Sequence, residues 1–350
     1  MVTEPRPIAA VLLSLVIGTT GGALFYYWTL PLPWMLGSMI FVSACAFAGV
    51  PVRRYMPLRN IMVVVLGVLL GSFFTVGFFS ELLTWGGAIL IMIGYVVVTT
   101  AVSLFVFRTL GYMDTTTAYF SSTPGGLGIM VLAGEEAGGD HRLIPVAHAT
   151  RVFVVVLTIP FYFVAIGHID LGNSPGFVIP TTQIPNNLEI LILSVCGVGG
   201  YWIAKWCGLT FGQILGPMIL AGAAYTTGLV TTPLPGPLVA ASQIVIGSTI
   251  GAQFRGVHPR TMFRPAIAAI VATSIMLVVA VLSSRFASPL LDLDEKALLL
   301  ALAPGGLAEM SLIAISMNTD TAFIATMHLV RITLIAGIAP ILFQLLWPRR

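Results

Sequence analysis

The sequence predicts an all-α polytopic membrane protein made of two inverted five-helix repeats, each with a broken or re-entrant helix. Together the repeats give about ten spans plus two hairpins. Three observations lead there. The 350-residue chain is 57% hydrophobic and only 8% charged. Its apolar stretches are each near the length of a transmembrane helix. The second half of the chain repeats the first.

The composition excludes a soluble domain, since soluble chains carry roughly 25% charged residues. The clearest apolar stretches of the first half are 8–28, 33–50, 60–79, 84–107 and 144–167. Each is close to the ~20 residues that an α-helix needs to cross the hydrocarbon core. Strands of a membrane barrel would be about half as long and would alternate apolar with polar residues. The lipid bilayer is therefore the first expected partner.

The repeat is visible when the chain is compared with itself. Pro124-Gly125-Gly126-Leu127 recurs 180 residues later as Pro304-Gly305-Gly306-Leu307. The same offset pairs further residues without a gap: Met130 with Met310, Asp140 with Asp320, His148 with His328, Arg151 with Arg331, and Pro160 with Pro340. We therefore divide the chain into a first membrane repeat at 1–167, a polar Pro- and Asn-rich linker at 168–187, and a second membrane repeat at 188–350.

Two glycine pairs also match at this offset, Gly67 and Gly71 with Gly247 and Gly251. Small residues four apart allow two helix backbones to approach closely. We interpret them as packing positions rather than as functional residues.

Basic residues indicate the orientation, because short cytoplasmic loops carry excess Lys and Arg. If the segment from Asp114 to about Gly139 crosses the membrane, each repeat has six spans and the copies are parallel. If it re-enters, each repeat has five spans and the copies are inverted. In the inverted arrangement the two strongest basic loops, Lys205 and the C-terminal tail all lie inside; the residues concerned are Arg53, Arg54, Arg59, Lys205, Arg255, Arg260, Arg264, Arg349 and Arg350. We favour this arrangement, with both termini on the cytoplasmic side of an inner membrane.

The segment around each Pro-Gly-Gly has two arms of about ten residues, each too short to span alone. Asp114 and Asp294 precede the first arms as expected helix N-caps. Pro124 and Pro304 fit the first turn of the second arms, and the paired glycines Gly125-Gly126 and Gly305-Gly306 permit the break. Broken helices at matching places in two repeats are typical of a transporter site. A glycine kink for tight packing is the alternative.

A His and an Arg follow each hairpin, three residues apart and so on one helix face: His148 with Arg151, and His328 with Arg331. Each Arg lies about 12 Å into its span at 1.5 Å per residue. A cation at that depth normally faces a partner or an aqueous cavity. These four residues are thus candidate ligands for an anion such as a carboxylate. Alternatively, each Arg holds its own hairpin through loop carbonyls, Glu135, Glu136 or Asp140.

The two copies differ in ways that also inform function. Glu309 stands where the first copy has Ile129, and is a candidate proton or cation site, with Asp140 and Asp320 as further ion-coupling candidates. A structural carboxylate, neutral or paired with Arg, is the alternative for Glu309. Hydroxyl groups are concentrated in the first copy, where Ser122 and Thr123 join the predicted substrate ligands; Ser121, Ser122 and Thr123 oppose Ala301, Leu302 and Ala303.

Several functions are disfavoured by the residues. The net charge of +3 and the short basic clusters do not suit direct nucleic-acid binding. Cys45, Cys196 and Cys207 form no metal-binding or disulfide motif. The histidines are scattered along the chain. We expect no metal, no cofactor and no enzymatic activity. A homo-oligomer is compatible with the sequence.

The duplicated STPGGLG and APGGLAEM segments, each followed by D…H-x-x-R, resemble the bacterial AbrB-duplication membrane family. The resemblance covers nearly the whole chain. Members carry labels as ammonia monooxygenases or as regulators of gene expression. The family is also similar to the sodium/proton antiporters and bile-acid symporters, which implies inverted repeats crossing at broken helices. We expect a secondary transporter of a small solute, favouring an anion or weak acid, coupled to H⁺ or Na⁺. The alternative is a membrane-embedded regulator or sensor that affects gene expression indirectly.

Overall fold

The computed structural model describes residues 7–74, 81, 84–167, 185–209, 212–256 and 259–347. Across these ranges the regular structure is helical throughout, which confirms the all-α prediction. Ten helices have 15 residues or more: α1 (Pro7–Tyr27), α2 (Pro33–Phe47), α3 (Met56–Gly71), α5 (Gly86–Thr109), α8 (Leu143–Gly167), α9 (Asn187–Trp206), α10 (Gly212–Thr226), α11 (Gly236–Gly251), α12 (Pro259–Leu291) and α15 (Thr321–Leu346). Seven of the helices are long and apolar enough to cross a membrane.

Four short helices have eight or ten residues: α6 (Thr115–Ser122), α7 (Leu127–Glu136), α13 (Glu295–Leu302) and α14 (Leu307–Ser316). They are the arms of the two Pro-Gly-Gly segments. α13 and α14 begin and end 180 residues after α6 and α7. We call α6, its Pro-Gly-Gly turn and α7 the first hairpin, and α13, its turn and α14 the second hairpin.

The described chain forms two compact units, and each combines segments from both halves of the sequence. The first compact unit comprises Met1–Glu81, Pro160–Gly256 and Ile315–Ala322, and so contains α1 to α3 and α9 to α11. The second comprises Leu82–Ile159, Val257–Ala314 and Phe323–Arg350, and holds both Pro-Gly-Gly turns. The expected linker, at 168–184, lies outside the described residues.

Close helix contacts in the first compact unit follow the sequence repeat. In α3, a Cβ atom added to Gly67 would lie 2.6 Å from the carbonyl oxygen of Ile214 in α10. In α11, one added to Gly247 would collide with the carbonyl of Met35 in α2. In the repeat, α3 corresponds to α11 and α2 corresponds to α10. The contact of α3 with α10 and the contact of α11 with α2 are therefore equivalent, as expected for two repeats related by a twofold axis. These glycines serve close packing, as predicted.

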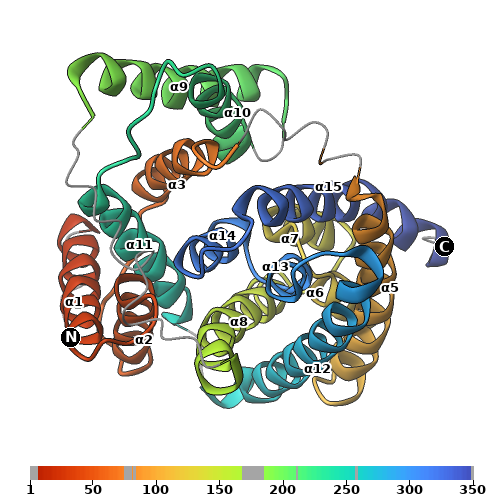
Figure 1. The fold of residues 1–350 in the computed structure, drawn as a ribbon. Coiled ribbons are helices and arrows are strands. Elements are labelled where there is room, and N and C mark those ends of the chain that lie inside the picture. The colour runs from red at the N-terminus through yellow and green to blue at the C-terminus, as the bar shows by residue number, and fades with distance from the viewer. Residues whose placement is uncertain are drawn as a thin grey trace. The chain divides into compact units, whose positions relative to one another are not determined.

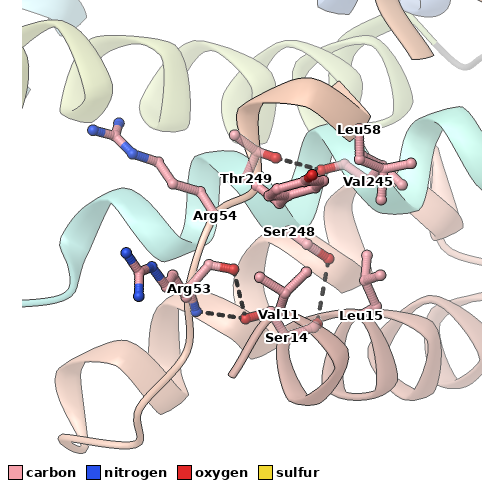
Figure 2. A pocket seen from close by; sticks show the side chains of 10 residues that line it. Val11, Ser14, Leu15, Arg53, Arg54, Leu58, Val245, Ser248 and Thr249 are labelled. Atoms are coloured by element: carbon pink, nitrogen blue, oxygen red, sulfur yellow. Dashed lines mark hydrogen bonds between the residues drawn. The ribbon is translucent and has the colours of Figure 1, made fainter. Parts of the chain in front are cut away.

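The two basic loops are joined at one end of the first compact unit. The Ser14 side chain accepts a hydrogen bond from the Arg53 amide at 2.7 Å and donates one to the Arg53 carbonyl at 3.1 Å, beside a cavity of only about 10 Å³ (Figure 2). The side chains of Arg53 and Arg54 extend away from that cavity (Figure 2). From the other loop, Arg255 donates to the Val52 carbonyl at 3.2 Å. Arg53 and Arg255 therefore lie at the same end of the unit.

The second compact unit packs its long helices around the short ones. α5 packs against α12 and α6, and α12 packs against α13 (Figure 1). Small buried residues make this packing close, among them Ala118, Ala147, Ala268 and Ala272. The last six residues of α6 and of α13 are all buried. Polar backbone at the turns is thereby enclosed by protein, which hydrocarbon surroundings require.

Candidate functional site

The first hairpin begins at Asp114, whose carboxylate accepts from the Thr117 amide at 3.0 Å and so caps α6 as predicted. The segment then turns back on itself. The amide of Asp140, beyond the end of α7, donates to the Thr117 hydroxyl at 2.8 Å. The end of this segment therefore lies beside its start.

The placement of the prolines differs from the prediction. α7 begins at Leu127, three residues after Pro124, and α14 begins at Leu307, three after Pro304. Pro124 thus lies in the turn rather than in the first turn of the helix. Gly126 is the N-cap of α7, with a φ of 63°, and glycine adopts this left-handed conformation without a Cβ penalty. The glycine, rather than the proline, sets the start of the helix.

The second hairpin begins with the predicted cap, since Asp294 accepts from the Ala297 amide at 3.3 Å. Glu309 is the third residue of α14 and is only 7% exposed. Its carboxylate lies over Gly306, where an added Cβ would collide with it. A carboxylate at that place is favoured by the positive end of the helix. The first hairpin has Ile129 there and lacks this charge.

Both predicted side chains of α8, those of His148 and Arg151, form hydrogen bonds with the end of α6. Arg151 donates to the Thr123 carbonyl at 2.6 Å, and Nε2 of His148 bonds the Phe120 carbonyl at 2.9 Å. These carbonyls lie at the end of α6, where helix carbonyls lack the usual amide partner four residues later. The Phe120 carbonyl also accepts from the Thr123 hydroxyl at 3.3 Å, and the Thr123 carbonyl from the Gly125 amide at 2.9 Å. The Arg151 guanidinium also lies at the C-terminal end of α6, where the negative end of the helix dipole favours a cation. Of the alternatives for Arg151, the structure shows the one in which it holds its own hairpin.

α15 holds the end of α13 with more bonds. Arg331 donates to the carbonyls of Leu302, Ala303 and Gly305, at 3.2, 2.6 and 2.9 Å. A fourth contact, at 2.9 Å, joins it to Nδ1 of His328. His328 bonds the Leu300 carbonyl through Nε2 at 2.9 Å. Arg331 is fully buried.

These bonds fix the hydrogen positions on both imidazoles. A carbonyl only accepts, so Nε2 carries the hydrogen in His148 and in His328. A guanidinium only donates, so Nδ1 of His328 is the acceptor of Arg331. In the described structure Nδ1 of His148 has no hydrogen-bond partner. Two residues at equivalent sequence positions thus differ in their chemistry.

The two hairpins approach each other at α15. Gly125 of the first turn lies against Ile332 and Ile335, and Ile332 directly follows Arg331 in the sequence. Arg151 and Arg331 are near enough to interact electrostatically. The structure therefore brings together the four predicted His and Arg side chains and both Pro-Gly-Gly turns. All of them belong to the second compact unit.

Tyr95 is a site residue that the sequence analysis missed. It is 3% exposed on α5, donates to the Met276 carbonyl at 3.2 Å, and lies within electrostatic range of both Arg151 and Arg331. A signal was present, because its partner at offset 180 is the apolar Ile275. A polar residue facing an apolar equivalent marks a position where the two copies differ.

The predicted hydroxyl ligands have different roles. Ser122 donates to the Tyr119 carbonyl at 2.7 Å and Thr123 to the Phe120 carbonyl at 3.3 Å, so both bond within their own helix segment. Ser121, by contrast, is buried and has no hydrogen-bond partner in the described structure. Of these three hydroxyls, that of Ser121 is therefore the one available for a further hydrogen bond.

The predicted ion-coupling aspartates lie apart from the buried groups. Asp140 is exposed and accepts from the amides of Arg142 and Leu143 at 2.7 and 3.3 Å, just where α8 begins. Asp320 is exposed directly before α15. Glu309 is the buried carboxylate of the three. Within the described ranges, no group of three or more His, Cys, Asp or Glu could hold a metal ion.

A groove of about 460 Å³ lies between the first hairpin and the end of α15. The hairpin contributes Phe120 and Glu136, and α15 contributes Phe343, Gln344 and Trp347. The rings of Phe120 and Phe343 are 5.0 Å apart. Its volume is that of a small-molecule pocket. Phe120 links the groove to the site, since its carbonyl binds His148.

Long apolar helices, paired hairpins and a buried cluster of Arg and His define an all-helical protein of the polytopic membrane class. Comparisons with known proteins agree with the resemblance noted in the sequence. Residues 34–347 match the family model described as "Transition state regulatory protein AbrB", and the chain belongs to this AbrB family.

Two relatives are similar to the chain. The "Uncharacterized protein YhjN" of Bacillus subtilis (strain 168) is 23% identical over 95% of this chain and 92% of its own length. The "Putative regulator AbrB" of Escherichia coli (strain K12) is 29% identical over 62% of each chain.

Proposed function

We propose that the protein is a secondary transporter of a small anion or weak acid. One observation carries this proposal. In the described structure every hydrogen bond of Arg151 and Arg331 goes to a backbone carbonyl or to His328, and neither guanidinium pairs with a carboxylate. Two neighbouring buried cations without an acidic partner attract an anion strongly, because burial reduces solvent screening.

The geometry of the hairpins supports an inverted topology. A first hairpin that returns to its starting side leaves five crossing helices in the half: α1, α2, α3, α5 and α8. An odd number inverts the second half relative to the first. The basic loops joined through Arg255 and Val52 then lie together on the cytoplasmic side of an inner membrane, with both chain termini. The first hairpin enters from the cytoplasmic side and the second from the opposite side.

In this mechanism the solute binds between the two turns. Arg151 and Arg331 supply positive charge, the Gly125-Gly126 and Gly305-Gly306 turns supply backbone groups, and Ser121 supplies a hydroxyl. Alternating access exposes this centre first to one side of the membrane and then to the other. Glu309 is a candidate for binding H⁺ or Na⁺. The proposal includes no enzymatic step, metal or cofactor.

Transport can be tested with purified protein in liposomes. We expect a labelled anion from a panel of acetate, lactate, benzoate and phosphate to accumulate under an imposed pH or Na⁺ gradient. Arg151→Gln should abolish the accumulation, whereas Arg108→Gln, at the exposed end of α5, should leave it intact. Absence of flux with every member of the panel under both gradients would argue against transport.

A second candidate, a membrane-embedded sensor or regulator, is favoured by the names of the family model and of the Escherichia coli relative. The 460 Å³ groove would then hold the sensed molecule. This candidate predicts a protein partner that co-purifies in stoichiometric amount, and a regulatory phenotype that survives Arg151→Gln. Loss of the phenotype in that variant would favour transport instead.

A further inference from the structure

We propose that His148, through Nδ1, is the proton-binding group of the first hairpin and that its equivalent His328 is locked in the neutral form. The inference rests on the proposed transport function, which it deepens by assigning the coupling ion to H⁺. The transported species would be a carboxylate or similar monovalent anion, moved together with one proton.

The difference between the two histidines carries the proposal. Each uses Nε2–H to bond a backbone carbonyl, of Phe120 and Leu300 respectively, at 2.9 Å. A proton can therefore be added only at Nδ1. In His328 that nitrogen accepts a hydrogen bond from Arg331, and a protonated Nδ1 could not accept it. In His148 the same nitrogen is fully buried and unpartnered in the described structure.

His148 lies in a strongly positive environment. The charged or titratable groups on its own helix include Arg151 and, further along α8, Tyr162; the surrounding helices add Tyr95 of α5, Tyr119 of α6, and His328 and Arg331 of α15. Glu135 and Glu136 lie at the exposed end of α7, and Arg264 at the exposed start of α12. The hydroxyls of Tyr95 and Tyr119 donate to backbone carbonyls, of Met276 and Ala339.

This environment couples the proton to an anion. A proton added at Nδ1 forms an imidazolium beside the Arg151 guanidinium, and two adjacent buried cations repel each other. An anion bound by Nε of Arg151 and the Ser121 hydroxyl, both buried and unpartnered in the described structure, offsets that repulsion. One proton leaves a donor in water and forms the N–H bond at Nδ1, and one anion binds. The pair enters as a neutral unit, and both are released on the other side.

Histidine-selective nitrogen NMR of the full-length protein in detergent tests the proton site without requiring transport. We expect the Nδ1 signal of His148, identified by its loss in His148→Gln, to shift between about pH 5 and about pH 8 when acetate is present. The signal of His328, identified with His328→Gln, should not shift. Arg331→Gln should free Nδ1 of His328 and make its signal pH-dependent. A pH-dependent His328 in the wild type, or a His148 signal that does not move, would overturn the proposal.

Flux measurements separate the failure of this inference from the failure of transport. A glutamine at 148 keeps an N–H group that can bond the Phe120 carbonyl but cannot bind a proton at this pH. His148→Gln should therefore lose accumulation driven by a pH gradient, whereas Arg108→Gln, at the exposed end of α5, should keep both anion exchange at equal pH and pH-driven accumulation. Retained pH-driven accumulation in His148→Gln would refute His148 as the proton site while upholding transport. No flux in the wild type, with His148 still titrating, would refute transport alone.

Discussion

The two hairpins share a sequence pattern and a backbone arrangement, but they differ in the number of hydrogen bonds that hold them. Arg331 makes three bonds to the end of α13 and one to His328, whereas Arg151 makes one bond to the end of α6. The second hairpin also carries a buried carboxylate, Glu309, at the start of α14. The two hairpins therefore differ in how many bonds their Arg side chains make and in the presence of a buried carboxylate.

Buried polar atoms without partners lie around both hairpins, and the unpartnered imidazole nitrogen belongs to the first. In the described structure they include Oγ of Ser121, Nδ1 of His148 and Nε of Arg151 around the first hairpin, and Oγ of Ser311 and Nε of Arg331 around the second. On α5, Thr100 and Ser103 add two more. A buried polar group without a partner costs roughly 1 to 3 kcal/mol. Such a cost is characteristic of positions kept for binding rather than for stability.

The largest expected effect is on the arginines. Arg331→Ala leaves three buried carbonyls unpaired, and we expect it to lower the free energy of unfolding by at least about 3 kcal/mol. Arg151→Ala removes one bond to the Thr123 carbonyl, which keeps its bond from the Gly125 amide at 2.9 Å, and should cost about 1 kcal/mol. Denaturant unfolding of both variants in detergent measures the difference. Equal losses would contradict the comparison of the hairpins.

A smaller effect is expected at the base of the first hairpin. Thr117→Val removes the acceptor of the Asp140 amide and should cost about 1 kcal/mol. The second hairpin has Ala297 at this position and lacks such a hydroxyl. Hydrogen exchange should accelerate at the Asp140 amide. Thr115→Val, at a half-buried position of the same helix, is the matched control and should not change that exchange.

The smallest effect concerns Tyr95. Tyr95→Phe removes one hydrogen bond to the Met276 carbonyl, and stability should fall by about 1 kcal/mol or less. If the hydroxyl also contacts the bound anion, the apparent affinity for that anion should fall several-fold in the flux assay. Tyr112→Phe, at an exposed position, is the control. Unchanged affinity in Tyr95→Phe would remove this residue from the site.

Much of this arrangement could be predicted from the sequence, because the repeat constrained it. Matching Pro-Gly-Gly segments and matching His and Arg positions predicted the hairpins and their convergence. Glu309 was recognised because the copies could be compared residue by residue. Contacts that depend on side-chain direction could not be predicted in this way. Ser121, Ser122 and Thr123 are indistinguishable in sequence, yet only the hydroxyl of Ser121 is left without a partner.

Other features required the three-dimensional arrangement. Tyr95 lies within α5, the helix before the first hairpin, and its proximity to Arg151 of α8 depends on how α5 packs. The two compact units likewise combine segments of both halves, which no single repeat reveals. The prolines were placed one turn too far into the helices, because the left-handed Gly126 starts α7 after them.

Cysteine labelling tests the central claim, that the first hairpin presents its polar groups to solute and the second does not. In a variant with Cys45, Cys196 and Cys207 replaced by alanine, Ser121→Cys and Ala301→Cys place one thiol at equivalent positions. We predict that a small water-soluble maleimide labels the thiol at 121 many times faster than the thiol at 301, and that a transported anion slows the labelling. Equal labelling at both positions, or no labelling at 121, would contradict the account.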